Sequence, residues 1–124
     1  MAYETKDTRV GTVLAGANLT AKQFRFVNID SAGEWDIASA GGPAPGVLQN
    51  NPADGQVAEV ECGPGRVVMT ICDGNVTRGA YVAVGATGGA VDVTTTKYRV
   101  GIALSAGVAG DIIPVLFGFQ GIEP

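Results

Sequence analysis

The side chains that could carry out acid–base or nucleophilic chemistry are few in this sequence of 124 residues. Histidine is absent, so a catalytic acid or base would have to be a carboxylate, a thiol or one of three lysines. Asp36 and Asp92 have similar surroundings, because the triplet Trp35–Ile37 aligns with the triplet Val91–Val93. Two carboxylates related by a pseudo-twofold axis can act as an acid and a base. Each aspartate alternates with apolar neighbours, however, which predicts that both point outward as solvated side chains.

The two thiols, Cys62 and Cys72, have no histidine that could activate them as nucleophiles. Between them, Gly63–Arg66 is typical of a hairpin turn, in which Cys62 would face about Val67. Cys72 would then lie about five residues further along its strand, beyond the roughly 7 Å between Cα atoms that a disulfide can span. We therefore predict two reduced, mostly buried thiols.

Ligand sets for metals, phosphates and nucleic acids are not evident either. The sequence has no Cys-x-x-Cys pair and no acidic loop with the spacing that calcium requires. Pro64 stands where a phosphate-binding loop would present an N–H group. The eight basic residues are scattered and the formal charge is −4, which argues against binding to a nucleic-acid backbone. We expect a protein that is not an enzyme, with no catalytic residues, no metal and no cofactor.

The first residues of the chain and two Asn-x-Thr triplets indicate the cellular compartment in which the protein is made. The first residues, MAYETKDTR, are charged, and no apolar run approaches the roughly 20 residues of a membrane helix. We expect synthesis in a cytosol and no membrane partner. Asn18–Thr20 and Asn75–Thr77 have the form of glycosylation acceptors, but without a secretory signal we interpret them as turn residues that open two equivalent strands.

An internal repeat organises the chain. Val100–Phe117 has the same pattern as Pro45–Cys62, namely a glycine, a short apolar stretch, a turn, a second glycine and a strand. Gly101 follows Gly46 at the same separation in sequence as Gly110 follows Gly55. The repeat predicts one β domain over residues 9–124 with two similar halves, about 9–66 and 67–124. The polar residues 1–8 lack periodicity and are predicted to form an N-terminal arm.

The elements that must position these residues are short strands. The composition, with 46% hydrophobic residues, 19 glycines and 16% charged residues, is typical of a compact, turn-rich protein. Arg9–Leu14 is strand-like, and Gln23–Val27 alternates so that Phe24 and Phe26 would share one face. No run of ten or more residues has the apolar period of a helix. The sequence therefore predicts an all-β barrel or sandwich.

The last strand differs from the others in its lack of alternation. Ile112–Phe119 is apolar at every position except Gly118, which predicts cover on both faces, by the domain or by a neighbouring subunit. Pro114 cannot donate a ladder hydrogen bond and marks an edge strand. An apolar edge should not be left in water, so the domain is expected to associate with itself.

Three segments of the second half, Gly79–Gly85, Gly101–Leu104 and Ala109–Val115, resemble the tailed-phage capsid cement, or decoration, proteins. That family has a small strand ending in Val and Gly, a Gly-Val-Ala-Leu segment, an Ala-Gly turn and a final strand. The first half departs from this pattern at Pro45–Leu48. The resemblance implies a β-tulip-like barrel or sandwich on the outside of an icosahedral phage head, bound across joints between major capsid subunits, commonly as a trimer.

The function predicted from the residues and this resemblance is structural. A protein with few reactive groups, an apolar terminal strand and a polar arm is suited to being bound, here to the major capsid protein and to further copies of itself in a homotrimer on the capsid exterior. The residues expected to make these contacts come from the arm and the last strand: Tyr3, Glu4, Lys6, Ile113, Leu116, Phe117 and Phe119.

A non-catalytic β domain that binds a carbohydrate or a cell-surface ligand is the alternative function. Such a domain would present aromatic side chains on an exposed face. The chain has eight aromatic residues, and Phe24, Phe26, Trp35 and Tyr81 stand at positions predicted to point inward. This placement favours the structural function over the alternative.

Overall fold

The computed structural model describes residues 8–118 and 121–124 of the chain, and these contain ten β-strands and no helix. The strands form two five-stranded antiparallel sheets packed in a sandwich-like arrangement and not a closed barrel, so the predicted all-β class is confirmed. The bounds of the strands are β1 Arg9–Leu14, β2 Phe26–Ile29, β3 Trp35–Ile37, β4 Gly46–Leu48, β5 Val57–Glu61, β6 Val67–Ile71, β7 Tyr81–Val84, β8 Ala90–Asp92, β9 Gly101–Ala103 and β10 Ile112–Phe117.

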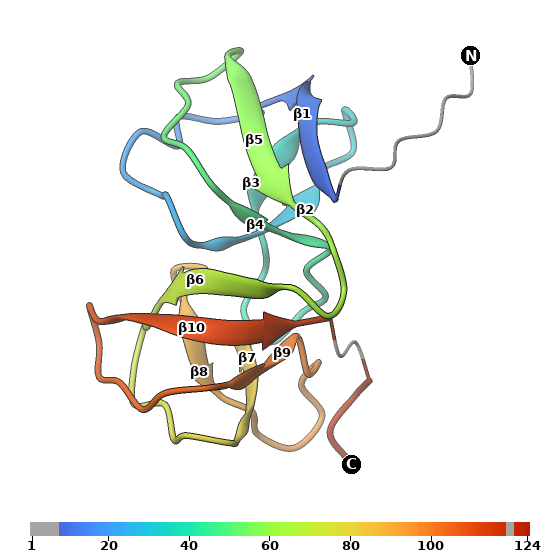
Figure 1. Ribbon diagram of the computed structural model, residues 1–124. Helices are drawn as coiled ribbons and strands as arrows, with labels where there is room; N and C mark the ends of the chain where they lie inside the picture. The colour runs from blue at the N-terminus through green and yellow to red at the C-terminus, as the bar shows by residue number, and fades with distance from the viewer. Residues whose placement is uncertain (1–7, 119–120) are drawn as a thin grey trace.

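The two sheets have the same strand order. The first runs β1-β5-β4-β2-β3 and the second β6-β10-β9-β7-β8, so each strand of the first has an equivalent five strands later in the chain. Figure 1 shows them as two lobes, one above the other. We call β1–β5 with their loops the first lobe and β6–β10 with theirs the second lobe.

Strand pairing fixes which residues are equivalent between the lobes. Val27 pairs with Ile37 in the first lobe, and Val82 pairs with Asp92 in the second, so the equivalent of Asp92 is Ile37. The alignment that matched Asp36 with Asp92 was therefore wrong by one position. The two aspartates are not equivalent and do not form a symmetric pair.

A bulge in β1 gives the first lobe an additional residue. Val10 pairs with Val60 and Val13 with Ala58, so three steps along β1 match two along β5. The equivalent pairing of β6 with β10 proceeds one residue at a time. This bulge accounts for one of the residues by which the segment Arg9–Glu61 is longer than its equivalent, Val67–Leu116.

The core joins the lobes. One cluster of buried side chains, which includes Trp35 and Leu48, belongs to the first lobe alone. A larger cluster contains side chains from both lobes, and within it the ring of Phe26 stacks on that of Phe117 with centroids 6.4 Å apart. Burial of aromatic surface from both lobes in one cluster couples their stabilities.

β2 begins later than the sequence predicted, at Phe26, and Phe24 is not part of its alternating face. Phe24 has a φ of 70°, a conformation that bulky residues seldom adopt. Its N–H donates to the carbonyl of Leu48, and its carbonyl accepts a hydrogen bond from the N–H of Ile71 in β6. The backbone of Phe24 therefore ties the first lobe to the second.

β10 is not an edge strand, contrary to the prediction from Pro114, because it lies between β6 and β9. The carbonyl of Pro114 accepts from the N–H of Leu104, one residue beyond the end of β9. In an antiparallel strand the nitrogen and the carbonyl of one residue point toward the same neighbouring strand. The nitrogen of Pro114 therefore points toward β9, at the place where the ladder between β9 and β10 ends. The one bond that proline cannot supply is the reciprocal bond to the carbonyl of Leu104, at the very end of the β9–β10 ladder.

The segment Gly63–Arg66 turns, since the N–H of Arg66 donates to the carbonyl of Gly63, but it does not form the predicted hairpin. β5 and β6, on either side of it, belong to different sheets. The turn is the covalent link between the lobes.

A carboxylate holds the same turn in each lobe but comes from different positions. In the first lobe, Asp30 accepts the N–H groups of the turn 31–34, and a Cβ on Gly16 would lie 2.4 Å from that carboxylate. In the second lobe the equivalent of Gly16 is Asp73, which accepts the N–H groups of Thr87 and Gly89. The equivalent of Asp30 is then a glycine, Gly85.

Asp73 also joins the lobes through an ion pair with Arg25, whose Nη1 lies 3.1 Å from the carboxylate. Partial burial alone would raise the pKa of Asp73. The hydrogen bonds from Thr87 and Gly89 and the charge of Arg25 outweigh burial and hold the pKa of this carboxyl below its usual value. The carboxylate is therefore ionised throughout the neutral pH range.

Candidate interaction surface

The structure separates the residues predicted to make contacts. Ile113 and Phe117 are buried in the shared core and pack within the chain. Leu116 lies on the opposite face of β10 and is partly exposed. The remaining predicted contact residues, Tyr3, Glu4, Lys6 and Phe119, lie outside the described residues. Of the described contact residues, Leu116 is the one placed on the surface.

Leu116 belongs to a larger apolar surface on β6 and β10. The side chains that share its face come from alternating positions of the two strands and lie opposite one another in the sheet. Val67 is 58% exposed, Met69 42% and Ile112 49%. We call this surface the apolar face, and its members are Val67, Met69, Ile71, Ile112, Pro114 and Leu116.

The first lobe shows that the fold does not require this surface to be apolar. At the positions equivalent to Val67 and Leu116 it carries Arg9 and Glu61, which pair across β1 and β5. Glu59 occupies the position of Pro114 by the same register. The same strands therefore tolerate charged side chains at these positions, and the sheet does not require apolar ones there.

The sequence reasoning missed Val67 and Met69 as surface residues. Both belong to an apolar strand, and their buried neighbour is Thr70, which is fully buried while Met69 is exposed. At these two positions of β6 the polar side chain points inward and the apolar one outward, the reverse of the usual arrangement. The sequence carried no direct signal for this surface, because the pairing of β6 with β10, which places two apolar faces side by side, is seen only in the structure.

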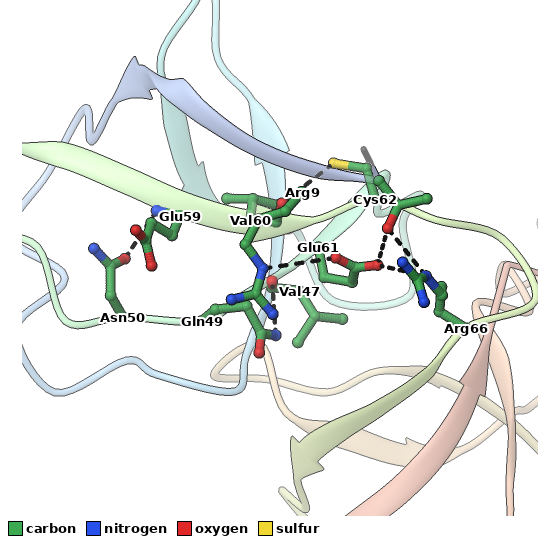
Figure 2. Close-up of polar contacts among 10 residues, drawn as sticks. Arg9, Val47, Gln49, Asn50, Glu59, Val60, Glu61, Cys62 and Arg66 are labelled. Carbon is green, nitrogen blue, oxygen red and sulfur yellow. Dashed lines mark hydrogen bonds and ion pairs between the residues drawn. The ribbon is translucent and has the colours of Figure 1, made fainter. Parts of the chain in front are cut away.

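A cleft of about 400 Å³ separates the free edge of β6 from the outer face of the first lobe. Figure 2 shows the buried carboxylate of Glu61 here, between the guanidinium groups of Arg9 and Arg66. Arg9 Nε lies 3.8 Å and Arg66 Nε 3.4 Å from its oxygens. The residues that line the cleft are Thr8, Arg9, Gln49, Glu61, Arg66, Val67, Val68 and Met69.

Glu61 is 7% exposed and would be costly to bury without partners. The hydroxyl of Thr8 donates to it, and the N–H of Cys62 donates to the carbonyl of Thr8. Thr8, which the sequence assigned to the arm, is thus held against β5. The cluster fixes the start of β1 and the link between the lobes, and it leaves two basic side chains at the mouth of the cleft.

The carboxylates considered as an acid–base pair are engaged separately. Asp36 accepts the N–H of its neighbour Ile37, and Asp92 accepts the N–H and the hydroxyl of Thr77. Among residues 8–118 and 121–124, no group of three or more carboxylate or thiol side chains could hold a metal ion. In the same part of the chain, no helix has the length and apolar character needed to span a membrane.

One aromatic residue lies on the surface against expectation. Tyr81, predicted to point inward, is 38% exposed, with the guanidinium of Arg99 4.6 Å from its ring centroid. Phe26 and Trp35 are buried. A single ring under a cation does not make the aromatic platform that the alternative function, carbohydrate binding, would use.

Both cysteines are free thiols, in agreement with the prediction, although Cys62 is only half-buried. Cys62 lines a second, mostly apolar hollow of about 610 Å³ with three prolines and Phe117. Burial and then the charge of Glu61 raise the pKa of the Cys62 thiol to about 11. Burial also raises the pKa of Cys72. Both side chains therefore remain thiols, not thiolates, at neutral pH.

A thiol assay tests this description. Freshly prepared protein should give two thiols per chain after denaturation. Before denaturation, both should react slowly at pH 8, because a pKa near 11 in place of 9.0 leaves Cys62 with roughly 100-fold less thiolate. Fewer than two thiols in the denatured protein, or fast reaction in the native one, would contradict it.

A solved structure has the same fold as this protein over nearly the whole chain. The crystal structure of the head fiber gp8.5 N base in bacteriophage phi29 superposes with a TM-score of 0.73 at 17% sequence identity, covering 94% of this chain and 99% of that chain. The two chains share one fold. No protein-family model and no curated protein matches the sequence. The likeness is thus to the phi29 head-fibre base, and the resemblance to the cement proteins in particular is not confirmed.

Proposed function

We propose that this chain is a structural protein of a phage head, which decorates the outer surface of the icosahedral capsid and stabilises the joints between major capsid subunits. The observation that carries the proposal is the likeness in fold to the phi29 head-fibre base, which covers both chains almost completely. We further propose that the protein acts as a homotrimer. These assignments agree with the apolar contact area that β6 and β10 present on the surface.

The apolar face supplies the contact with the major capsid protein in this proposal. Val67, Met69 and Ile112 each expose about half of their side chains to water. Covering a large apolar side chain contributes roughly 1.5–3 kcal/mol when burial is complete. A handful of such residues at the centre of an interface can dominate its binding energy.

Binding to stripped heads tests the proposal. Purified protein is mixed with capsids freed of decoration proteins, and the bound fraction is measured by cosedimentation and located by electron microscopy. Saturable binding at a fixed set of capsid joints is the expected result. Failure to bind heads from the cognate phage, under conditions that preserve the capsid lattice, would refute the function.

The N-terminal residues 1–7 are proposed to strengthen the hold on the capsid or on the trimer. Their deletion, with Thr8 retained because it contacts β5, should shift the thermal midpoint of the free protein by less than about 2 °C. Capsids decorated with the shortened chain should release it at lower temperature. The full-length variant Tyr3→Ala, compared with the deletion, measures how much the tyrosine ring contributes. Equal affinity and equal heat resistance would show that the segment is only a tail.

A further inference from the structure

We infer that the cleft between the lobes is a strand-addition site, which takes an extended peptide segment with carboxylate side chains from another protein chain. The inference goes beyond the proposed capsid contact, which uses the side chains of the apolar face. It rests on the backbone edge of β6 and on the charges of the facing wall, and it would stand whatever particle the protein belongs to.

The first step concerns the direction of the backbone groups of β6. β6 is the edge of its sheet and pairs with β10 on one side only. The N–H of Ile71 points away from β10, since it donates to the carbonyl of Phe24. Backbone groups alternate in direction along an antiparallel strand, so those of Val67 and Met69 also point outward. These are the groups that an added strand would pair with.

The second step is that this edge is open where it borders the cleft. Exposed edges are usually covered, because their unpaired N–H and C=O groups attract other strands. Phe24 covers the end of β6 at Ile71, whereas Val67 and Met69 line the cleft. In the described part of the chain, no backbone hydrogen bond beyond the sheet reaches either residue. A peptide in the cleft would continue the sheet at these two residues.

The third step is the charge of the facing wall. Arg9 and Arg66 each leave more than half of the side chain exposed, while the carboxylate of Glu61 between them is nearly covered. Two guanidinium groups against one carboxylate leave a net positive charge, in a chain whose formal charge is −4. Guanidinium groups have several donors each and favour carboxylates. Two cations are too few for a nucleic-acid backbone, whereas they suit one or two acidic side chains on an extended segment.

The test uses a fluorescent, end-capped peptide of alternating valine and glutamate with the full-length protein. Binding is expected, and methylation of the peptide nitrogens that face β6 should weaken it about tenfold or more, because each loses a main-chain donor. A valine–glutamine peptide should bind the unmodified protein more weakly than the valine–glutamate peptide does. The valine–glutamate peptide should in turn bind the Arg66→Gln variant more weakly than the unmodified protein. Equal binding of the methylated or the glutamine peptide would overturn the inference.

A variant of β6 supplies the matching change in the protein. Met69→Pro removes the outward N–H and leaves the ladder to β10 intact, and proline is tolerated at such edges. It should bind the peptide about tenfold more weakly than Met69→Ala, which also loses the Met69 side chain but keeps the N–H. Tighter binding of a peptide with the sequence of residues 1–7 than of the acidic peptide would overturn the assignment to a foreign segment. The peptide assays need no capsid, so their failure is distinct from failure of the decoration function.

Discussion

Replacement of Ile112 by aspartate should abolish measurable capsid binding while the free protein stays folded. Ile112 is 49% exposed at the start of β10, so water already reaches the position and a charge there costs little in the free chain. In the complex the carboxylate would be buried among apolar atoms, at a cost of several kcal/mol. Each 1.4 kcal/mol corresponds to about tenfold in affinity. Leu116→Asp, within the same face, should act in the same direction.

The first lobe provides a matched control for this variant. Val57 is the equivalent of Ile112 by register and is 47% exposed, but its neighbours on β5 include charged side chains. Val57→Asp should therefore bind capsids as the unmodified protein does. Affinity by cosedimentation, with circular dichroism to verify folding, decides the matter. Undiminished binding of both Ile112→Asp and Leu116→Asp would remove the apolar face from the interface.

Replacement of Phe26 by alanine should lower the free energy of unfolding by about 3–5 kcal/mol. Phe26 is fully buried and stacks on Phe117 from the other lobe, so the truncation removes contacts from both sides of the shared core. The cavity left behind cannot be filled by a side chain from one lobe without distorting the other. Urea unfolding followed by tryptophan fluorescence measures the change.

The equivalent residue in the second lobe is Tyr81, which pairs with Ile102 as Phe26 pairs with Val47. Tyr81 is partly exposed, and Tyr81→Ala should cost only about 1 kcal/mol, mainly through the lost contact with Arg99. The contrast between the two variants measures how much the lobe contact contributes. Similar losses in both would mean that the lobes are stabilised independently.

The sequence could predict the repeat wherever the backbone demands a particular residue. A Cβ on Gly46 would lie 2.2 Å from Val60, and one on Gly101 would lie 2.6 Å from Val115, so both glycines permit the same close approach of strands. Because this requirement recurs at equivalent places, the alignment of the glycines agrees with the strand register. The aspartates satisfy no such backbone requirement, and the alignment built on them was wrong by one position.

What could not be predicted depends on contacts between distant segments. A turn signal at Gly63–Arg66 says that the chain reverses locally, but not whether the next strand joins the same sheet or another. Pro114 lacks a donor in any sheet, and only the early end of β9 makes that harmless in the interior. The candidate surfaces were hidden for the same reason, since the apolar face and the cleft are assembled from strands that the sequence does not pair.

The carboxylate that secures the turn in each lobe makes the lobes non-interchangeable. The side chain of Asp30 fits only where position 16 is glycine. The side chain of Asp73 fits only where position 85 is glycine, because a Cβ added to Gly85 would lie 2.7 Å from it. A chimera with Gly16 and the 85–89 turn would have no carboxylate, and the opposite chimera would force two into one space. The two positions are therefore epistatic. Recombination or design that shuffles cassettes between the lobes has to transfer both positions together.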